Sequence, residues 1–243
     1  MEGVGKKKER AAASAAALVE DGMVVGLGTG STAELVIRKI GERVREEGLK
    51  ILAVATSVQS ELLAAECGIP LTTLDAHFPL HICIDGADQV DSDLNLLKGG
   101  WGSHTREKVV AAAAKRLVIC VDDSKLVEWL SKPVPLEVLP YARRVVFGAV
   151  RALGGTPTLR THAKGAAPFF TEHGNLVVDA DFGEIRDPKA LSVKLSEIPG
   201  VVEHGIFTLA EKTEVHVGRD GRIEILKPKS RGAKVKKLQY TKR

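Results

Sequence analysis

Two aspartates, a lysine and a glutamate follow one another between positions 85 and 107, separated by glycine-rich turns. Asp85 closes a short apolar run and Asp88 follows at a spacing of three, which brings both carboxylates to one side if the chain curls there. Lys98 precedes two glycines, and Glu107 follows a few residues later. These groups suit removal of a carbon-bound proton next to a carbonyl, because the lysine and free N–H groups can stabilise the resulting oxyanion.

Each of these residues also has a purely structural interpretation. The two aspartates could cap a helix, or they could hold Mg²⁺. Lys98 could be a solvated loop residue. Glu107 falls in the first turn of a helix predicted over residues 105–115, where a surface acid commonly complements the helix dipole.

A second candidate site is the loop Gly28-Thr29-Gly30-Ser31-Thr32, which lies between a predicted strand and a predicted helix. It lacks the third glycine of a dinucleotide-binding loop and the lysine of a P-loop. Free backbone N–H groups, three hydroxyls and a helix N-terminus together suit one phosphate group. The alternative is that Ser31 or Thr32 merely caps the helix.

Alternating apolar runs and amphipathic stretches must position these groups. Strands are predicted at 23–27, 51–55, 82–85 and 117–121, and helices at 6–20, 33–44, 56–68 and 105–115. Strands that are apolar throughout indicate a mostly parallel sheet with helices on both faces. Asp85 then lies at the carboxyl end of a strand, where open α/β sheets bind ligands.

The pattern changes at Lys132-Pro133-Val134-Pro135, which reads as a crossing between domains. Predicted helices at 141–153 and 188–197, with short strands at 158–161, 168–171, 176–179 and 202–207, suit a smaller α+β domain. Strands at 215–217 and 222–226 form a closing hairpin or sheet edge. We therefore expect a Rossmann-like domain from 1–131 and 207–228, a small domain from 132–206 and a disordered basic tail from 229–243.

Composition narrows the classes of protein. Aromatic residues are only 4% of the chain, which argues against base-stacking platforms for nucleic acid. No apolar run could span a membrane and no signal peptide is evident, so a cytoplasmic location is expected. Three cysteines suit a reducing compartment, and the absence of metal-ligand spacings predicts no metal and no cofactor. The basic residues after 226 predict a solvated tail, with RNA or DNA attachment as the alternative.

Several motifs together resemble those of A-type ribose-5-phosphate isomerases. They are GLGTGST at 26–32, DGAD at 85–88, KGG at 98–100, TREK at 105–108 and DSK at 123–125. PVPLEVLP at 133–140, HGNLVVD at 173–179 and IPGVVEHGIF at 198–207 are similar to that family's second domain.

The resemblance implies a metal-independent interconversion of ribose 5-phosphate and ribulose 5-phosphate through an enediolate, in the non-oxidative pentose phosphate pathway. Glu107 would carry the proton between C1 and C2, and Asp85 would open the ring and move protons between the oxygens. Lys98 would stabilise the enediolate, with Asp88 orienting it. The implied substrate-binding residues are Thr29, Gly30, Ser31, Thr32, Asp85, Gly86, Ala87, Asp88, Lys98, Gly99, Gly100, Trp101 and Lys125, with Lys8 as a further phosphate contact.

The family fold is a sheet domain with a ferredoxin-like insertion, and its members are homodimers or homotetramers. This chain departs from the family pattern at Trp101, which replaces a third loop glycine, and at Gln89, which replaces a glutamate. The alternative function is a sugar-phosphate-sensing module of the same architecture. Such a module needs the phosphate loop but not the Glu107 base.

Overall fold

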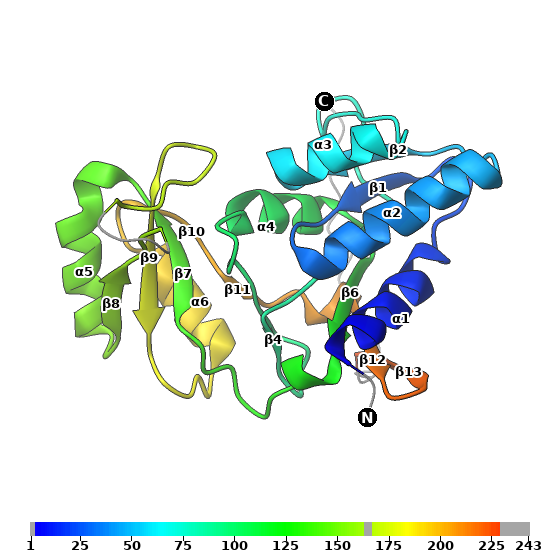
Figure 1. Ribbon diagram of the computed structural model, residues 1–243. Helices are drawn as coiled ribbons and strands as arrows, with labels where there is room; N and C mark the ends of the chain where they lie inside the picture. Colours follow the sequence, from blue (N-terminus) through cyan, green and yellow to red (C-terminus); the bar gives the residue numbers. More distant parts are fainter. Residues whose placement is uncertain (1–2, 163–166, 229–243) are drawn as a thin grey trace, which may run out of the picture.

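A six-stranded sheet forms the larger part of the molecule (Figure 1). The computed structural model describes residues 3–162 and 167–228. The strand order is β13-β12-β6-β3-β1-β2. All neighbours are parallel except the closing β12–β13 hairpin, as the sequence predicted. The strands are β1 (Val24–Leu27), β2 (Leu52–Ala55), β3 (Ile82–Asp85), β6 (Leu117–Asp122), β12 (Thr213–Arg219) and β13 (Arg222–Leu226).

Helices cover both faces of this sheet. Helices α1 (Val4–Ala16), α2 (Ser31–Glu46) and α3 (Val58–Glu66) pack on one face, and α4 (His104–Ala113) packs on the other. Within β6, Val118 and Cys120 belong to the first core, whereas Ile119 and Val121 belong to the second. The central strands β1, β3 and β6 are buried along their whole length because helices cover both of their faces.

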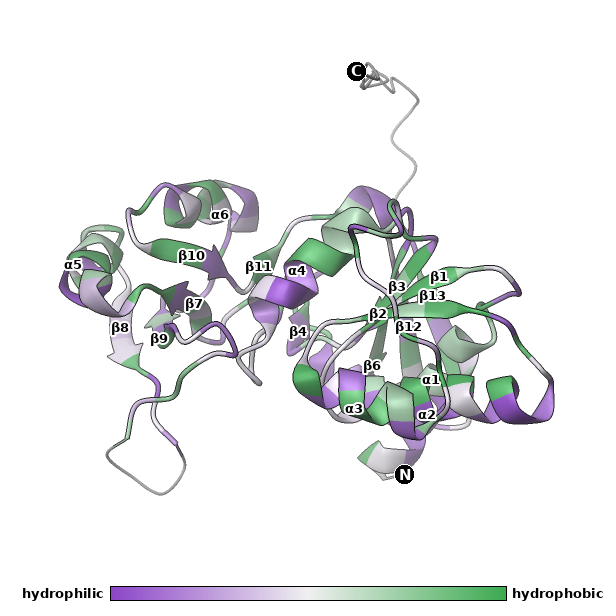
Figure 2. Cartoon of the chain, turned by 90° about the horizontal axis from the view of Figure 1, so that it is seen from above, coloured by the Kyte–Doolittle hydropathy of each residue, from purple (hydrophilic) through white to green (hydrophobic). Residues whose placement is uncertain are grey.

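A smaller antiparallel sheet with two helices lies beside the first unit (Figure 2). Its strand order is β10-β7-β9-β8. Buried apolar side chains of α5 (Arg143–Ala152) and α6 (Pro188–Ser196), Val146, Val150 and Leu195 among them, pack in one core with the sheet. The strands are β7 (Val134–Val138), β8 (Thr156–Leu159), β9 (Leu176–Asp181) and β10 (Val201–His204). All four fall within 132–206, and we keep the boundaries 1–131 with 207–228 and 132–206 as a proposal.

The predicted crossing at residues 132–135 is partly wrong, because β7 begins at Val134. Prolines argue against an interior strand. Pro135 is tolerated here because it lies beside the end of β10. The Pro135 carbonyl accepts a hydrogen bond from the Gly205 N–H at 2.8 Å, and Gly205 follows His204, the last paired residue of β10. The Pro135 nitrogen, which has no hydrogen to donate, therefore lies beyond the paired part of β10.

The predicted strand over 202–207 is in fact two strands that part at Gly205. β10 joins the small sheet, while β11 (Ile206–Phe207) pairs with β5 (Leu96–Leu97), which pairs with β4 (Gln89–Val90). Two-residue strands carry no periodicity, so the sequence could not predict this second small sheet. The predicted strand at 168–171 is represented only by single bridges, Thr161 to Pro168 and Phe170 to Leu176.

Two further predictions concern the basic tail and the absence of a membrane-spanning segment. The basic tail 229–243 lies outside the described residues. Over 3–162 and 167–228, none of the helices has the length and apolar character needed to cross a membrane.

Candidate active site

The predicted site residues gather where β1 and β3 end side by side. The chain leaves β1 toward β2 on one side, and β3 pairs on the other side of β1, so a crevice opens at their carboxyl ends. The Gly28 N–H donates to the Ile84 carbonyl at 2.9 Å, which holds the two strand ends together. The loop 28–32 and Asp85 are therefore neighbours.

One cavity collects almost all of the predicted residues. Asp85 does not line it but lies directly behind it, in contact with Lys98. Lys8, from α1, completes the wall, and Lys125 reaches it from the short 3₁₀ turn Asp123–Lys125. The lining residues are Lys8, Thr29, Gly30, Ser31, Thr32, Gly86, Ala87, Asp88, Lys98, Gly99, Gly100, Trp101, Glu107 and Lys125.

A buried lysine lies between two buried carboxylates at the inner end of this cavity. Lys98 Nζ is 3.0 Å from Asp85 Oδ2 and 3.2 Å from Glu107 Oε2, and it donates to the Gly86 carbonyl at 2.6 Å. The three charged side chains are only 1–4% exposed. Apart from Lys98, neither of these two carboxylate oxygens has a hydrogen-bond partner among the described residues.

The surroundings of this cluster shift the pKa values of Glu107 and Lys98. Burial raises the pKa of Glu107 to about 8; the Lys98 ammonium lowers it, and Asp85 raises it further. Burial alone would lower the pKa of Lys98, but Asp85 and Glu107 outweigh burial and raise it. Lys98 therefore stays charged, while Glu107 exchanges its proton near pH 8. A base serves best when its pKa lies near the working pH.

Asp85 is fixed by the backbone around it. Its Oδ1 accepts the N–H of Thr29 at 3.1 Å and the N–H of Gly86 at 2.7 Å. A Cβ at Gly28 would lie 2.1 Å from the same oxygen, so only glycine fits there. The carboxylate thus turns its other oxygen to Lys98.

The predicted phosphate loop begins α2, and neither Ser31 nor Thr32 caps that helix. Gly30 is the N-cap residue, with φ +102°, and no side chain caps the helix. Ser31 Oγ accepts a hydrogen bond from Lys8 Nζ at 2.9 Å. The N-terminus of α2 therefore combines uncapped N–H groups with an ammonium group, which suits a phosphate.

The Thr29 hydroxyl, one of the three in the predicted phosphate loop, lies within a cluster of other hydroxyls. Its Oγ1 lies 2.7 Å from the hydroxyls of Thr56 and Ser57 and 3.1 Å from that of Ser60. Sequence reasoning missed these three residues. The available signal was that Thr56 and Ser57 directly follow a parallel strand, where ligand sites lie.

The two departures from the family pattern, Trp101 and Gln89, lie in different parts of the structure. The Trp101 indole is 60% exposed and packs over the loop, since a Cβ at Gly30 would lie 2.9 Å from its Nε1. Trp101 therefore forms part of the cavity rim. The Gln89 side chain bonds Ser131 and the N–H of Lys132 instead, so it holds the start of the small domain.

Across 3–162 and 167–228, no three His, Cys, Asp or Glu side chains group in a way that could hold a metal ion. The three cysteines are unpaired and buried, and burial raises the pKa of Cys83 and Cys120. In the inner cluster, the positive charge between the carboxylates comes from Lys98.

Comparison with known proteins agrees with this geometry. The family model described as ribose 5-phosphate isomerase A (phosphoriboisomerase A) matches residues 52–221, most of the chain. The chain belongs to this family. Ribose-5-phosphate isomerase A of Methanosarcina acetivorans is 53% identical over 221 residues, covering 90% of this chain and 94% of that protein. The Thermosynechococcus vestitus protein of the same name is 49% identical, covering 84% and 88%.

Solved structures of family members share the whole fold. Ribose 5-phosphate isomerase A from Methanocaldococcus jannaschii superposes with a TM-score of 0.87 at 44% identity, covering 91% of this chain and 98% of that one. A D-ribose-5-phosphate isomerase in complex with phospho-erythronic acid superposes with a TM-score of 0.89 at 37% identity, covering 93% and 100%. The parallel sheet with its small antiparallel domain is thus the family fold.

Proposed function

We propose that this chain interconverts D-ribose 5-phosphate and D-ribulose 5-phosphate through an enediolate, as an aldose–ketose isomerase of the non-oxidative pentose phosphate pathway. The observation that carries the proposal is the buried Glu107–Lys98–Asp85 cluster at the inner end of a cavity whose rim is an uncapped helix N-terminus. Family membership supports it, and so does the phospho-erythronic acid bound by a structural relative.

The phosphate group binds at the rim. The N-terminus of α2 offers the N–H groups of the 30–32 turn, and Lys8 and Lys125 add positive charge on the same cavity wall. Backbone donors, a helix dipole and ammonium groups are the usual phosphate ligands in proteins. This end fixes the substrate, so that its carbonyl end points toward Lys98.

The inner cluster then moves the proton. Glu107, as a carboxylate, removes the proton from C2 of the open-chain aldose and returns it to C1. Lys98 stabilises the negative oxygen of the enediolate, and Asp85 opens the ring and transfers protons between O1 and O2. Asp88 orients the sugar hydroxyls. A positioned base contributes roughly 10²–10⁴-fold. Oxyanion donors contribute on the order of 3–4 kcal/mol each.

Isomerisation in heavy water tests this proposal. The purified chain should convert ribose 5-phosphate and incorporate solvent deuterium at carbon, because Glu107 exchanges its proton during turnover. Glu107→Gln should lose both, whereas Glu42→Gln, which alters an exposed helix pair with Lys39, should keep both. Activity should survive exhaustive chelation. Binding without turnover by the unaltered chain would instead support a sugar-phosphate sensor, and equal rates for Glu107→Gln and the parent would refute the role of Glu107.

We also propose a homodimer or homotetramer in the cytoplasm. Tyr141 is 92% exposed, and Leu139 and Val145 on the same segment are exposed apolar side chains. Val202 is likewise exposed on β10, an edge strand of the small sheet. An exposed strand edge flanked by apolar side chains suits contact with a second copy. Light scattering of the parent and of Tyr141→Asp would test this, with a lower mass expected for the variant.

A further inference from the structure

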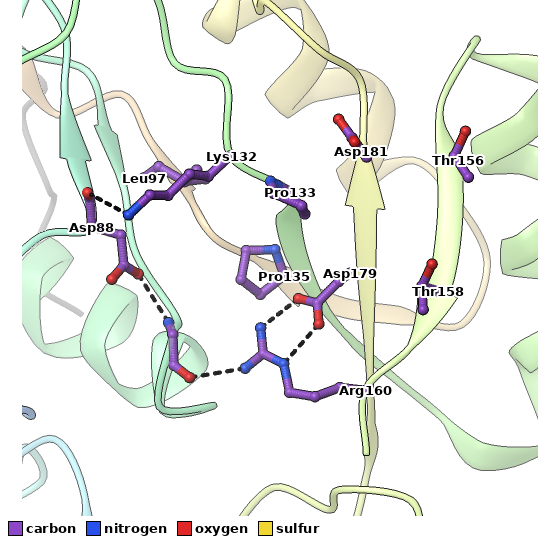
Figure 3. A pocket seen from close by; sticks show the side chains of 11 residues that line it. Asp88, Leu97, Lys132, Pro133, Pro135, Thr156, Thr158, Arg160, Asp179 and Asp181 are labelled. Atoms are coloured by element: carbon purple, nitrogen blue, oxygen red, sulfur yellow. Dashed lines mark hydrogen bonds and ion pairs between the residues drawn. The ribbon is translucent and has the colours of Figure 1, made fainter. Parts of the chain in front are cut away.

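An arginine of the small domain reaches the loop that carries Lys98. Arg160 follows β8, and its Nη1 donates to the Gly99 carbonyl at 2.8 Å and to the Gly100 carbonyl at 3.2 Å. The other side of the guanidinium binds both oxygens of Asp179 on β9, with Nε at 2.9 Å from Oδ2. Figure 3 shows Arg160 between Asp179 and this loop. The bidentate pair fixes the direction of the guanidinium.

The peptide group that Arg160 holds is also held at its other end. The carbonyl of Gly99 and the N–H of Gly100 belong to one peptide unit, and the Gly100 N–H donates to Asp88 Oδ2 at 3.0 Å. One peptide therefore joins Arg160 to Asp88. A positive group on the carbonyl polarises the peptide and strengthens the hydrogen bond of its N–H.

Other contacts with the small domain hold the same loop. The Lys98 N–H donates to the Gly205 carbonyl at 2.9 Å, at the point where the chain leaves the small sheet. The Phe169 ring lies against Gly102, where a Cβ would be 2.5 Å from Cε1, and the Arg160 guanidinium lies 5.9 Å from the centre of that ring. The loop from Lys98 to Gly102 is thus fixed from the small-domain side.

We propose that Arg160 is a positioning residue for the isomerase reaction. Paired with Asp179, it aims the Gly100 N–H at Asp88 and sets the path of the loop that places Lys98. It acts through the loop and does not line the cavity that holds the predicted site residues. The inference rests on the proposed function, because it assigns consequences to the orientation of Asp88 and Lys98.

The chemistry of the contact predicts which replacement fails. Arg160 makes four hydrogen bonds with one planar group, two to carbonyls and two to a carboxylate. A lysine keeps the charge but cannot form that arrangement. Arg160→Lys should therefore behave like Arg160→Gln if geometry matters, and like the parent if only charge matters.

Steady-state kinetics of the full-length protein give the main test. We expect Arg160→Gln and Arg160→Lys to lower kcat for ribose 5-phosphate at least tenfold, with KM changed less than threefold, and Asp179→Asn to give a smaller loss in the same direction. The matched control is Arg186→Gln, which removes an exposed arginine–glutamate pair of the small domain and should leave kcat unchanged. Values of kcat within twofold of the parent for both Arg160 variants, or full activity in Arg160→Lys, would overturn the proposal.

A second readout does not depend on turnover. In glycine-labelled protein, the amide proton of Gly100 should move upfield in Arg160→Gln, because its hydrogen bond to Asp88 weakens, while the amide of Gly148 should not move. An unmoved Gly100 signal would overturn the proposal even if kcat fell. If the unaltered chain shows no isomerase activity, the proposed function fails, whereas the shift still tests whether Arg160 orients the loop.

Discussion

Lys98 Nζ lies 3.2 Å from Glu107 Oε2, and the two side chains are only 4% and 3% exposed. The lysine is thus the group that keeps a buried glutamate ionisable. Without it, burial and Asp85 would both favour the neutral acid. The same ammonium that would stabilise the enediolate therefore also sets the basicity of the residue that would form it.

The pH dependence of catalysis should report this pair. Glu107 accepts a proton only as a carboxylate, so kcat/KM should rise with pH and level off above its pKa of about 8. Lys98→Met should lower the plateau and move the midpoint to higher pH, because the charge that lowers the pKa of Glu107 is gone. Profiles between pH 6 and 10 would check both effects. An unshifted midpoint in Lys98→Met would contradict the coupling.

Gly28→Ala should disable the site through Asp85. The new Cβ would lie 2.1 Å from Asp85 Oδ1 and 2.6 Å from its Cα, and a backbone atom cannot turn away. Because misplacement by about 1 Å can cost on the order of 10²-fold, we expect kcat/KM to fall by about that factor.

The matched control for Gly28→Ala is Gly148→Ala, within α5. A Cβ at Gly148 would meet no atom within 4 Å, so this change should raise stability by roughly 0.5–1 kcal/mol and leave activity intact. Chemical denaturation and initial rates would measure the two variants side by side. Normal activity in Gly28→Ala would show that the strand ends can separate without disturbing Asp85.

The contact of Trp101 with Gly30 should appear in a double-mutant cycle. Gly30→Ala adds a Cβ 2.9 Å from the indole Nε1 at a residue with φ +102°, so it should raise KM for the sugar phosphate. Trp101→Gly removes the clash but not the backbone strain of an alanine at φ +102° and ψ 176°, which costs roughly 1–3 kcal/mol. The double variant should therefore recover KM only in part. Additive effects would mean that the indole does not rest on this loop in solution.

Glu137 should be a stability residue. It is fully buried on β7 and accepts hydrogen bonds from Thr105 at the start of α4 and, at 2.8–2.9 Å, from Thr171, His173 and Asn175. Glu137→Gln places an amide donor among these donors, so we expect a loss of about 2–4 kcal/mol in the free energy of unfolding. Glu184→Gln, at an exposed pair, is the control and should change it little.

The sign of the pH effect at Glu137 follows from its partners. Burial raises the pKa of Glu137, but the four hydrogen bonds outweigh burial and lower it below its ordinary value of 4.5. Its contribution to stability is therefore present above pH 4.5 and is lost as pH falls through the folded-state pKa. Acid unfolding of Glu137→Gln should show a weaker pH dependence than that of the parent; identical slopes would count against this assignment.

The sequence predicted the parts of the fold that depend on local pattern. Apolar runs such as 82–85 and 117–121 become parallel strands, and the placement of Asp85 at a strand end followed from that. Other contacts join segments that are far apart in the chain, so no local spacing in the sequence could predict them. Examples are the hydroxyl cluster around Thr29 and the hydrogen bond from Arg160 to the Gly99 carbonyl. The sequence did not predict a strand through Pro135, because a proline is tolerated there only since β10 ends beside it, which depends on the tertiary arrangement.

The position of β12 has a consequence for synthesis of the chain. β12 occupies residues 213–219, yet it is the strand that pairs with β6 and supports α1 near the N-terminus. During translation, the antiparallel unit is complete while the larger sheet still lacks this strand. Helix α1 can then pack on α2 and β6, but it lacks its contacts with β12 until residues 213–219 have left the ribosome. Truncation shortly before 213 should therefore remove the β6–β12 pairing and the contact of β12 with α1, while residues 134–204, which form the antiparallel sheet, are all retained.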